Sequence, residues 1–132
     1  METCLLTIIT VTDGKKSEVT KRGQCLLSPT LTQIEYEEEN ARVSVRFEKG
    51  EAHVLREGDY TLSLPLKKGT KTLGEIGING AIGNVEIETS RIAYSQREND
   101  FTLSLRYSLW LGTERQNMSI RLLVKKEKGE KQ

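Results

Sequence analysis

The sequence predicts an all-β fold, a single antiparallel meander of about 8–10 strands closed into a barrel. Composition is the first indication, because 29 of the 132 residues are valine, isoleucine or threonine and only 4 are alanine. β-Branched side chains suit a pleated sheet, whereas alanine favours helices. The second indication is the even spacing of turn signals, which leaves segments of roughly 8 to 12 residues between them. Helical crossovers would need longer segments, so a βαβ architecture is disfavoured.

The first predicted strand contains an apolar run at 4–9 that places apolar side chains on both of its faces. One face of such a strand can line the core of the barrel. The apolar side chains on the other face are then exposed to solvent unless something packs against them, and a partner subunit is one candidate. This strand is therefore expected to differ from the others, which have one polar face.

The later segments alternate between apolar and polar residues. The pattern is strongest at 101–111, where one face carries Phe101, Leu103, Leu105, Tyr107, Leu109 and Leu111. Segments 43–47, 60–65, 85–88 and 118–125 alternate in the same way. Each of these strands therefore has one buried and one solvated face, as in antiparallel sheets around a single core. Closing the meander into a barrel removes edge strands that would otherwise invite aggregation.

Length and charge define the domain organisation and the partners. We expect one barrel domain over residues 1–124 and a charged, frayed C-terminal tail over residues 125–132. Twenty basic and nineteen acidic residues leave a net charge of +1. Nucleic-acid binding and membrane-surface binding are disfavoured, because both draw on a basic excess.

Two cysteines, Cys4 and Cys25, are too few for a disulfide scaffold and lack metal-ligand spacing. We expect two buried thiols, with a bridge between adjacent strands as the alternative. The N-terminus has no basic region ahead of its short apolar run, and no stretch approaches the roughly 20 apolar residues of a membrane span. A cytoplasmic location is therefore expected.

Three residues are candidates for contact with a ligand. Tyr60 and Tyr107 begin or interrupt leucine-rich inward faces, where a hydroxyl needs a partner. His53, the only histidine, is a weaker candidate for a polar group in a pocket. The structural alternatives are core tyrosines bonded to backbone and an ordinary strand histidine. No catalytic residue, metal site or cofactor is predicted, since paired carboxylates, ligand clusters and a nucleophile elbow are absent from the sequence.

A longer pattern resembles a known family. The run from Gly83 to Ile92 is followed by a strand containing Leu105, Tyr107, Leu109 and Gly112, and then by 117–120. This order is similar to that of the YwiB-like β-barrels, small bacterial proteins of unknown function grouped with the calycins. The resemblance covers most of the chain and is best defined over 58–124. It implies a closed or nearly closed barrel shaped like the lipocalins and the fatty-acid-binding proteins, and it brings no catalytic residues.

Two functions are weighed from these observations. The first is binding of a small, largely apolar molecule in the barrel or at its mouth, with Tyr60, Tyr107 and His53 as polar contacts. The second is a protein–protein interaction module or homodimer without a ligand, formed through apolar surface near the first strand and Trp110. An enzymatic activity has the weakest support.

Overall fold

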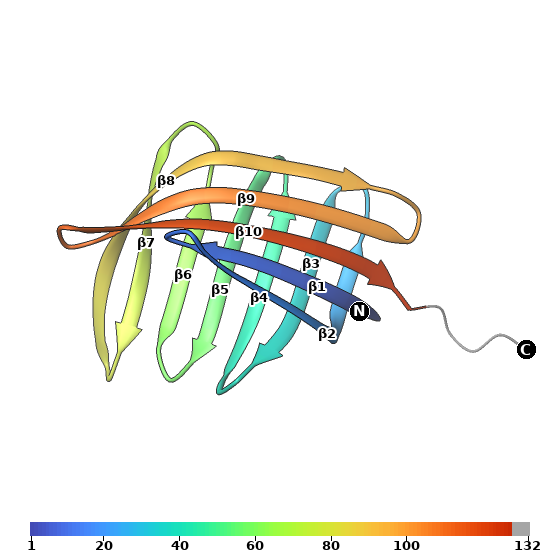
Figure 1. Cartoon of the computed structure of the whole chain (residues 1–132), viewed down its shortest axis with the longest axis horizontal. Coiled ribbons are helices and arrows are strands. Elements are labelled where there is room, and N and C mark those ends of the chain that lie inside the picture. Colours follow the sequence, from blue (N-terminus) through green and yellow to red (C-terminus); the bar gives the residue numbers. More distant parts are fainter. Residues whose placement is uncertain (128–132) are drawn as a thin grey trace, which may run out of the picture.

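Ten antiparallel strands form one closed barrel in a computed structural model that describes residues 1–127 (Figure 1). The strands are β1 (Glu2–Thr12), β2 (Lys15–Leu27), β3 (Leu31–Glu38), β4 (Ala41–Glu48), β5 (Glu51–Gly58), β6 (Thr61–Leu66), β7 (Lys71–Ile78), β8 (Ala81–Gln96), β9 (Asp100–Leu111) and β10 (Glu114–Lys126). Each strand pairs with the next one along the chain, and β1 pairs with β10 to close the ring. The predicted meander barrel is therefore confirmed. The described residues include no helix long and apolar enough to cross a membrane.

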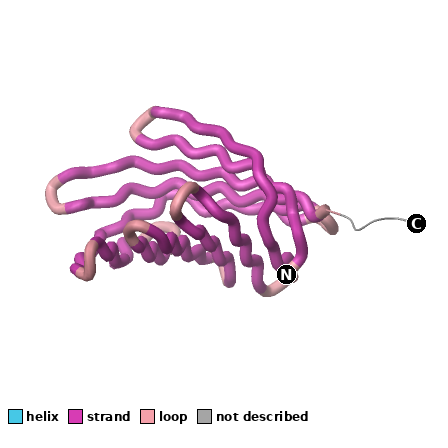
Figure 2. Tube along the Cα trace, turned by 90° about the horizontal axis from the view of Figure 1, so that it is seen from below, coloured by secondary structure: helices cyan, strands magenta, loops and turns pink. Residues whose placement is uncertain are grey.

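The barrel is flattened into two layers that cross at a steep angle (Figures 1 and 2). Strands β3 to β7 form one layer, and β9, β10, β1 and β2 form the other. The long strand β8 passes from the first layer to the second. A β-bulge between Thr89 and Arg91 lies midway along it. An extra residue in one strand bends it and increases its twist, which is what this corner of the barrel requires.

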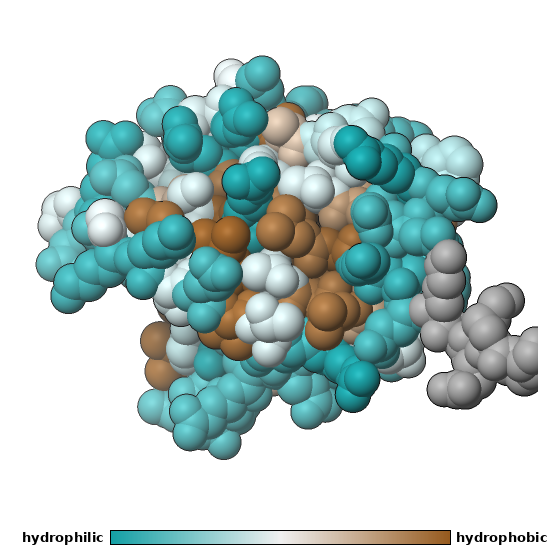
Figure 3. Space-filling model, turned by 45° about the vertical axis from the view of Figure 1, so that its right-hand side comes forward, coloured by the Kyte–Doolittle hydropathy of each residue, from teal (hydrophilic) through white to brown (hydrophobic). Residues whose placement is uncertain are grey.

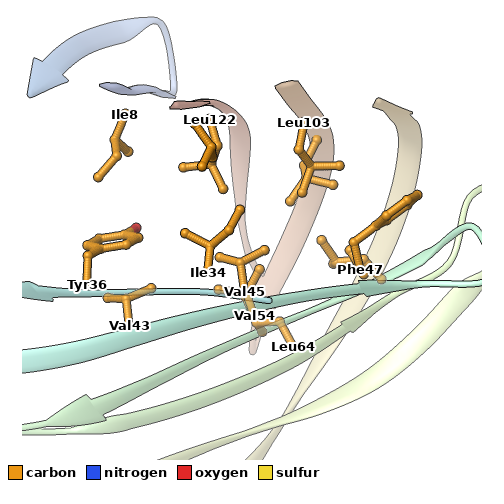
Figure 4. Close-up of a cluster of buried hydrophobic side chains, with 14 of the residues drawn as sticks. Ile8, Ile34, Tyr36, Val43, Val45, Phe47, Val54, Leu64, Leu103 and Leu122 are labelled. Atoms are coloured by element: carbon orange, nitrogen blue, oxygen red, sulfur yellow. The ribbon is translucent and has the colours of Figure 1, made fainter. Parts of the chain in front are cut away.

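The middle of the barrel is filled by apolar side chains from both layers. Ile8, Leu103 and Leu122 of one layer face Ile34, Val45 and Phe47 of the other (Figure 4). The alternation predicted for β9 is confirmed over 101–109, where Leu103 and Leu105 are buried whereas Arg106 is exposed. Leu111, predicted on the same inward face, ends the strand and is 42% exposed. Complete burial of one leucine stabilises the fold by about 1.5–3 kcal/mol. The two-layer core is therefore the main source of stability.

Both cysteines lie in this core as free thiols, and both are completely buried. Cys4 of β1 is opposite Gly23, two residues from Cys25 of β2. Burial raises the pKa of Cys4 to about 12, and the neighbouring Cys25 adds to the shift. Burial also raises the pKa of Cys25. Both sulfur atoms are therefore protonated near neutral pH.

The barrel continues two residues beyond the expected domain boundary. Lys125 and Lys126 belong to β10 and pair with Leu5 and Cys4 of β1. The backbone N–H of Glu127 donates to the carbonyl oxygen of Thr3 at 3.1 Å. The rest of the predicted tail, residues 128–132, lies outside the described residues.

The pairing of β2 with its two neighbours is unequal. It pairs with β1 over eleven residues, but with β3 only over Gln24–Leu27. Gly23 lies where β2 and β3 separate. A Cβ atom at this position would lie 2.5 Å from the carbonyl oxygen of Glu35 and 2.7 Å from Cδ1 of Leu6. The close approach of β2 to β3 therefore depends on a residue without a side chain.

We predict that Gly23→Ala lowers the free energy of unfolding by about 1–3 kcal/mol, because the new methyl group overlaps a backbone oxygen. Urea denaturation measures the change. Gly83→Ala is the matched control, since a Cβ there would meet its nearest atom, Cγ2 of Ile76, at an ordinary 3.7 Å. Equal stability changes in the two variants would contradict this account of the junction.

We also predict that Ellman's reagent leaves both thiols of the native protein unmodified at pH 8 and reacts with both after denaturation, because only an accessible thiolate attacks it. Ser95→Cys, which places a third thiol at an exposed position of β8, should react at once in the native protein. Rapid native labelling of Cys4 or Cys25 would show that the thiols are less enclosed than described.

Candidate functional site

One end of the barrel is open because β2 separates from β3 beyond Gln24. Residues Lys15–Gly23 pair with β1 alone, and the β1–β2 hairpin stands away from the β3–β7 layer (Figure 2). Val19 is opposite the buried Ile8 and so faces inward, yet 44% of its surface is exposed. Ile78 shares the inward face of β7 and is 49% exposed. We call this region the open end, and its partly exposed, inward-facing apolar residues are Val19, Leu62, Ile76, Ile78 and Met118.

Tyr107 comes from β9 and faces the interior between β8 and β10. It lies opposite the half-buried Met118 of the open end and opposite Thr89 on the other side. The ring is 3% exposed, and burial raises the pKa of its hydroxyl above the ordinary value. Thr89 is 1% exposed, and its Oγ1 has no hydrogen-bond partner among the described residues. Two neighbouring hydroxyl side chains therefore face the interior, and that of Thr89 has no partner among the described residues.

Tyr36 brings a third hydroxyl into the barrel from β3 (Figure 4). Burial raises its pKa above the ordinary value, and Glu38 and Tyr107 add to the shift. Lys21 of β2 lies opposite the buried Leu6 and so has an inward register. Its Nζ lies 5.7 Å from the centre of the Tyr36 ring and donates to the carbonyl oxygen of Glu37 at 2.7 Å. This lysine joins β2 to β3 where their backbone pairing has ended.

An arginine with inward register lies at the open end. Arg56 is paired between Val43 and Leu62, both on the inward face, and its side chain is only 15% exposed. Its guanidinium lies 3.9 Å from the centre of the Tyr60 ring and donates to the Tyr60 carbonyl oxygen at 3.0 Å. Tyr60 therefore covers this arginine at the β5–β6 turn, as a cation–π partner.

Two carboxylates accompany that arginine. Nη2 of Arg56 lies 3.0 Å from Oδ1 of Asp59, and Nε lies 3.8 Å from Oε2 of Glu38. The hydrogen bond from Arg56 holds the pKa of Asp59 below its ordinary value. The charge of this inward arginine is therefore compensated within the protein, as a partly buried charge requires.

His53 lies on the outer wall of the barrel, away from the two tyrosines. Its neighbours Ala52 and Val54 are buried, so the histidine faces outward, opposite Arg46 and Pro65. Its Nε2 forms a 2.9 Å hydrogen bond with Oγ of Ser63. Burial lowers the pKa of His53, and the charge of Arg46 lowers it further. The structure thus brings Tyr60 and Tyr107 to the open side of the barrel and leaves His53 on the opposite face of the sheet.

The pair of His53 and Ser63 has the composition of a base and a nucleophile, but it lies in regular strands. β5 pairs with β4 on one side and with β6 on the other over most of its length, so the backbone around His53 belongs to a regular sheet. Within residues 1–127, no three His, Cys, Asp or Glu side chains gather as metal ligands. The chemistry that the open end offers is hydrogen bonding, by hydroxyl side chains and by the paired Arg56 guanidinium, beside partly exposed apolar side chains.

A depression that the sequence did not predict lies at the end of the barrel opposite to the open end. It has a volume of about 330 Å³ and is lined by the 28–32 loop region, Phe47, Tyr94 and Gln96, among others. The Phe47 and Tyr94 rings lie 4.6 Å apart, and Tyr94 remains 58% exposed. The sequence contains a signal that Tyr94 faces inward. Inward positions along β8 change from odd to even numbers after Thr89, as expected for a strand with a bulge.

Comparison with known proteins agrees with this architecture. The crystal structure of the ywiB protein from Bacillus subtilis matches with a TM-score of 0.77 and 16% sequence identity, over 96% of this chain and 93% of that one. This similarity concerns the fold. No curated protein sequence matches the chain. The family model described as Domain of unknown function (DUF1934) matches residues 5–122, and the chain therefore belongs to this DUF1934 family.

Proposed function

We propose that the barrel binds a small, largely apolar, uncharged molecule through its open end. The observation that carries the proposal is the apolar inward surface that continues past the closed part of the barrel. Val19 and Ile78 face inward but are close to half exposed, and Leu62, Ile76 and Met118 are half-buried beside them. Exposed apolar surface that faces inward favours an apolar ligand, because covering it removes that surface from water.

Hydroxyl groups supply the polar contact. Tyr107 lies beside Met118 of the open end, and Oγ1 of its neighbour Thr89 is buried without a partner among the described residues. An unpaired buried hydroxyl costs about 1–3 kcal/mol, which a ligand oxygen nearby would recover. A hydroxyl or carbonyl group on the bound molecule satisfies this requirement.

The charge balance at the entrance favours a neutral ligand. Arg56 is the inward cation nearest to Leu62, and it is already within 4 Å of Glu38 and Asp59. Lys21 is engaged with the Glu37 carbonyl oxygen. A ligand carboxylate would have to compete with two resident carboxylates for Arg56. A long-chain alcohol therefore suits the site better than the corresponding fatty acid.

We predict that the protein binds the uncharged dye Nile red and that dodecan-1-ol displaces it at lower concentration than dodecanoate does. Fluorescence titration measures both. Ile78→Asp should weaken dye binding by about tenfold or more, because it places a charge on the apolar inward surface. Leu73→Asp is the matched control on the outer face of the same strand, with a wild-type residue that is 59% exposed.

The control should bind the dye as the wild-type protein does. The absence of a saturable Nile red signal, or an equal loss in the Ile78→Asp and Leu73→Asp variants, would overturn the open end as the binding site. Stronger displacement by dodecanoate would overturn the preference for an uncharged ligand.

A further inference from the structure

The outward face of β1 carries apolar side chains, which distinguishes β1 from strands whose outward face is polar. Leu5, Ile9 and Val11 point outward while Leu6 and Ile8 fill the core. Leu123 of β10 lies opposite Thr7 and extends the apolar surface. We call these four outward residues, Leu5, Ile9, Val11 and Leu123, the β1 face. Figure 3 shows apolar side chains gathered at the centre of this side of the molecule, with polar residues around them.

Besides charged side chains, the outward positions that adjoin the β1 face carry small hydroxyl residues. These are Thr7, Thr20, Thr102, Ser104 and Ser119. An apolar sheet face can pack against a second sheet at about 10 Å. The outward face of β3, by contrast, carries Gln33, Glu35 and Glu37. The β1 face is therefore distinguished from the outward face of β3 by its polarity.

Charged residues on either side of this face are arranged for a second copy of the same face. Ile9 lies between Arg121 of β10 and Glu18 of β2, in one row across the sheet. Neither charge forms an ion pair among residues 1–127. A two-fold axis parallel to β1 reverses the row, so that Glu18 of each copy faces Arg121 of the other. Such an axis is the symmetry of most dimers.

The row of residues through Leu5 is less favourable for a symmetric contact between two copies, so we place the edge of the contact there. Leu5 lies between Lys125 and Arg22, and the same axis brings these two cations towards each other. Glu127 lies 3.1 Å from Nε of Arg22 and offsets its charge. The strongest contact is therefore centred on Ile9 and its two complementary charge pairs.

We infer that the chain forms a homodimer by packing two β1 faces together about a two-fold axis parallel to β1. The inference is independent of the ligand site, which lies on the inward side of the sheet. Trp110 is not part of this interface. It lies on β9 opposite Glu86 and Arg115, and the Arg115 guanidinium is 5.2 Å from its ring centre.

Sedimentation velocity over micromolar to submillimolar concentrations tests the inference. The wild-type protein should shift from monomer to dimer as its concentration rises. Ile9→Glu should abolish the dimer, because it buries a charge on the symmetry axis. Trp110→Ala and Leu73→Glu, outside the interface, should leave the dimer unchanged. Circular dichroism checks that each variant keeps the wild-type fold.

A charge exchange tests the orientation of the two copies. Arg121→Glu should raise the dimer dissociation constant by about tenfold, since it sets a carboxylate against Glu18 in both symmetry-related contacts. The double variant Glu18→Arg with Arg121→Glu should restore the wild-type value to within about threefold. A strictly monomeric wild-type protein, a dimer that tolerates Ile9→Glu, or a charge exchange without restoration would each overturn the proposed dimer.

Discussion

Pairing between the first and last strands holds the barrel together. β1 and β10 are paired over nine residues from Cys4 to Thr12, and this ladder joins segments more than a hundred residues apart in the chain. Ordering so long a loop costs entropy that local turns do not recover. The cost is offset by side chains on this ladder, since Cys4, Leu6 and Leu122 are completely buried. Every other strand pair of the barrel joins neighbours along the sequence.

The same ladder relates the two proposed sites to the two faces of the β1 region. The inward residues of β1 complete the core, and its outward residues form the β1 face. β2 follows β1 along its whole length but leaves β3 at Gly23. The barrel is thereby closed and filled in its middle and open at one end. The proposed ligand site and the proposed dimer interface therefore lie on opposite sides of one sheet.

Much of this architecture is predictable from one-sided alternation. The inward positions of β4 and β9 follow directly from apolar residues at every second place, because only one face of each strand is dry. The outward position of His53 follows from the same rule, since Ala52 and Val54 occupy the inward places. Tyr107 is likewise placed correctly in the interior by its leucine neighbours.

Other features depend on geometry that alternation does not describe. The bulge after Thr89 changes which residues of β8 face inward, and it places Tyr94 at the far pocket. Arg56 has a polar side chain at an inward position, tolerated because Tyr60, Asp59 and Glu38 surround it. The change from odd to even inward positions along β8 signals the bulge, but polarity alone predicts neither the bend that it makes nor the cluster around Arg56. The separation of β2 from β3, which creates the open end, depends on contacts between distant residues.

Native-state hydrogen exchange measured by NMR tests the central role of the β1–β10 ladder most directly. If closure of the ring holds the barrel together, the hydrogen-bonded amides of β1 and β10 exchange only through global unfolding, with the same free energy as the core of β9. Amides of the β1–β10 ladder that exchange at a markedly lower free energy, while β4, β5 and β9 stay protected, would contradict the account. The barrel would then be stable without its closing pair.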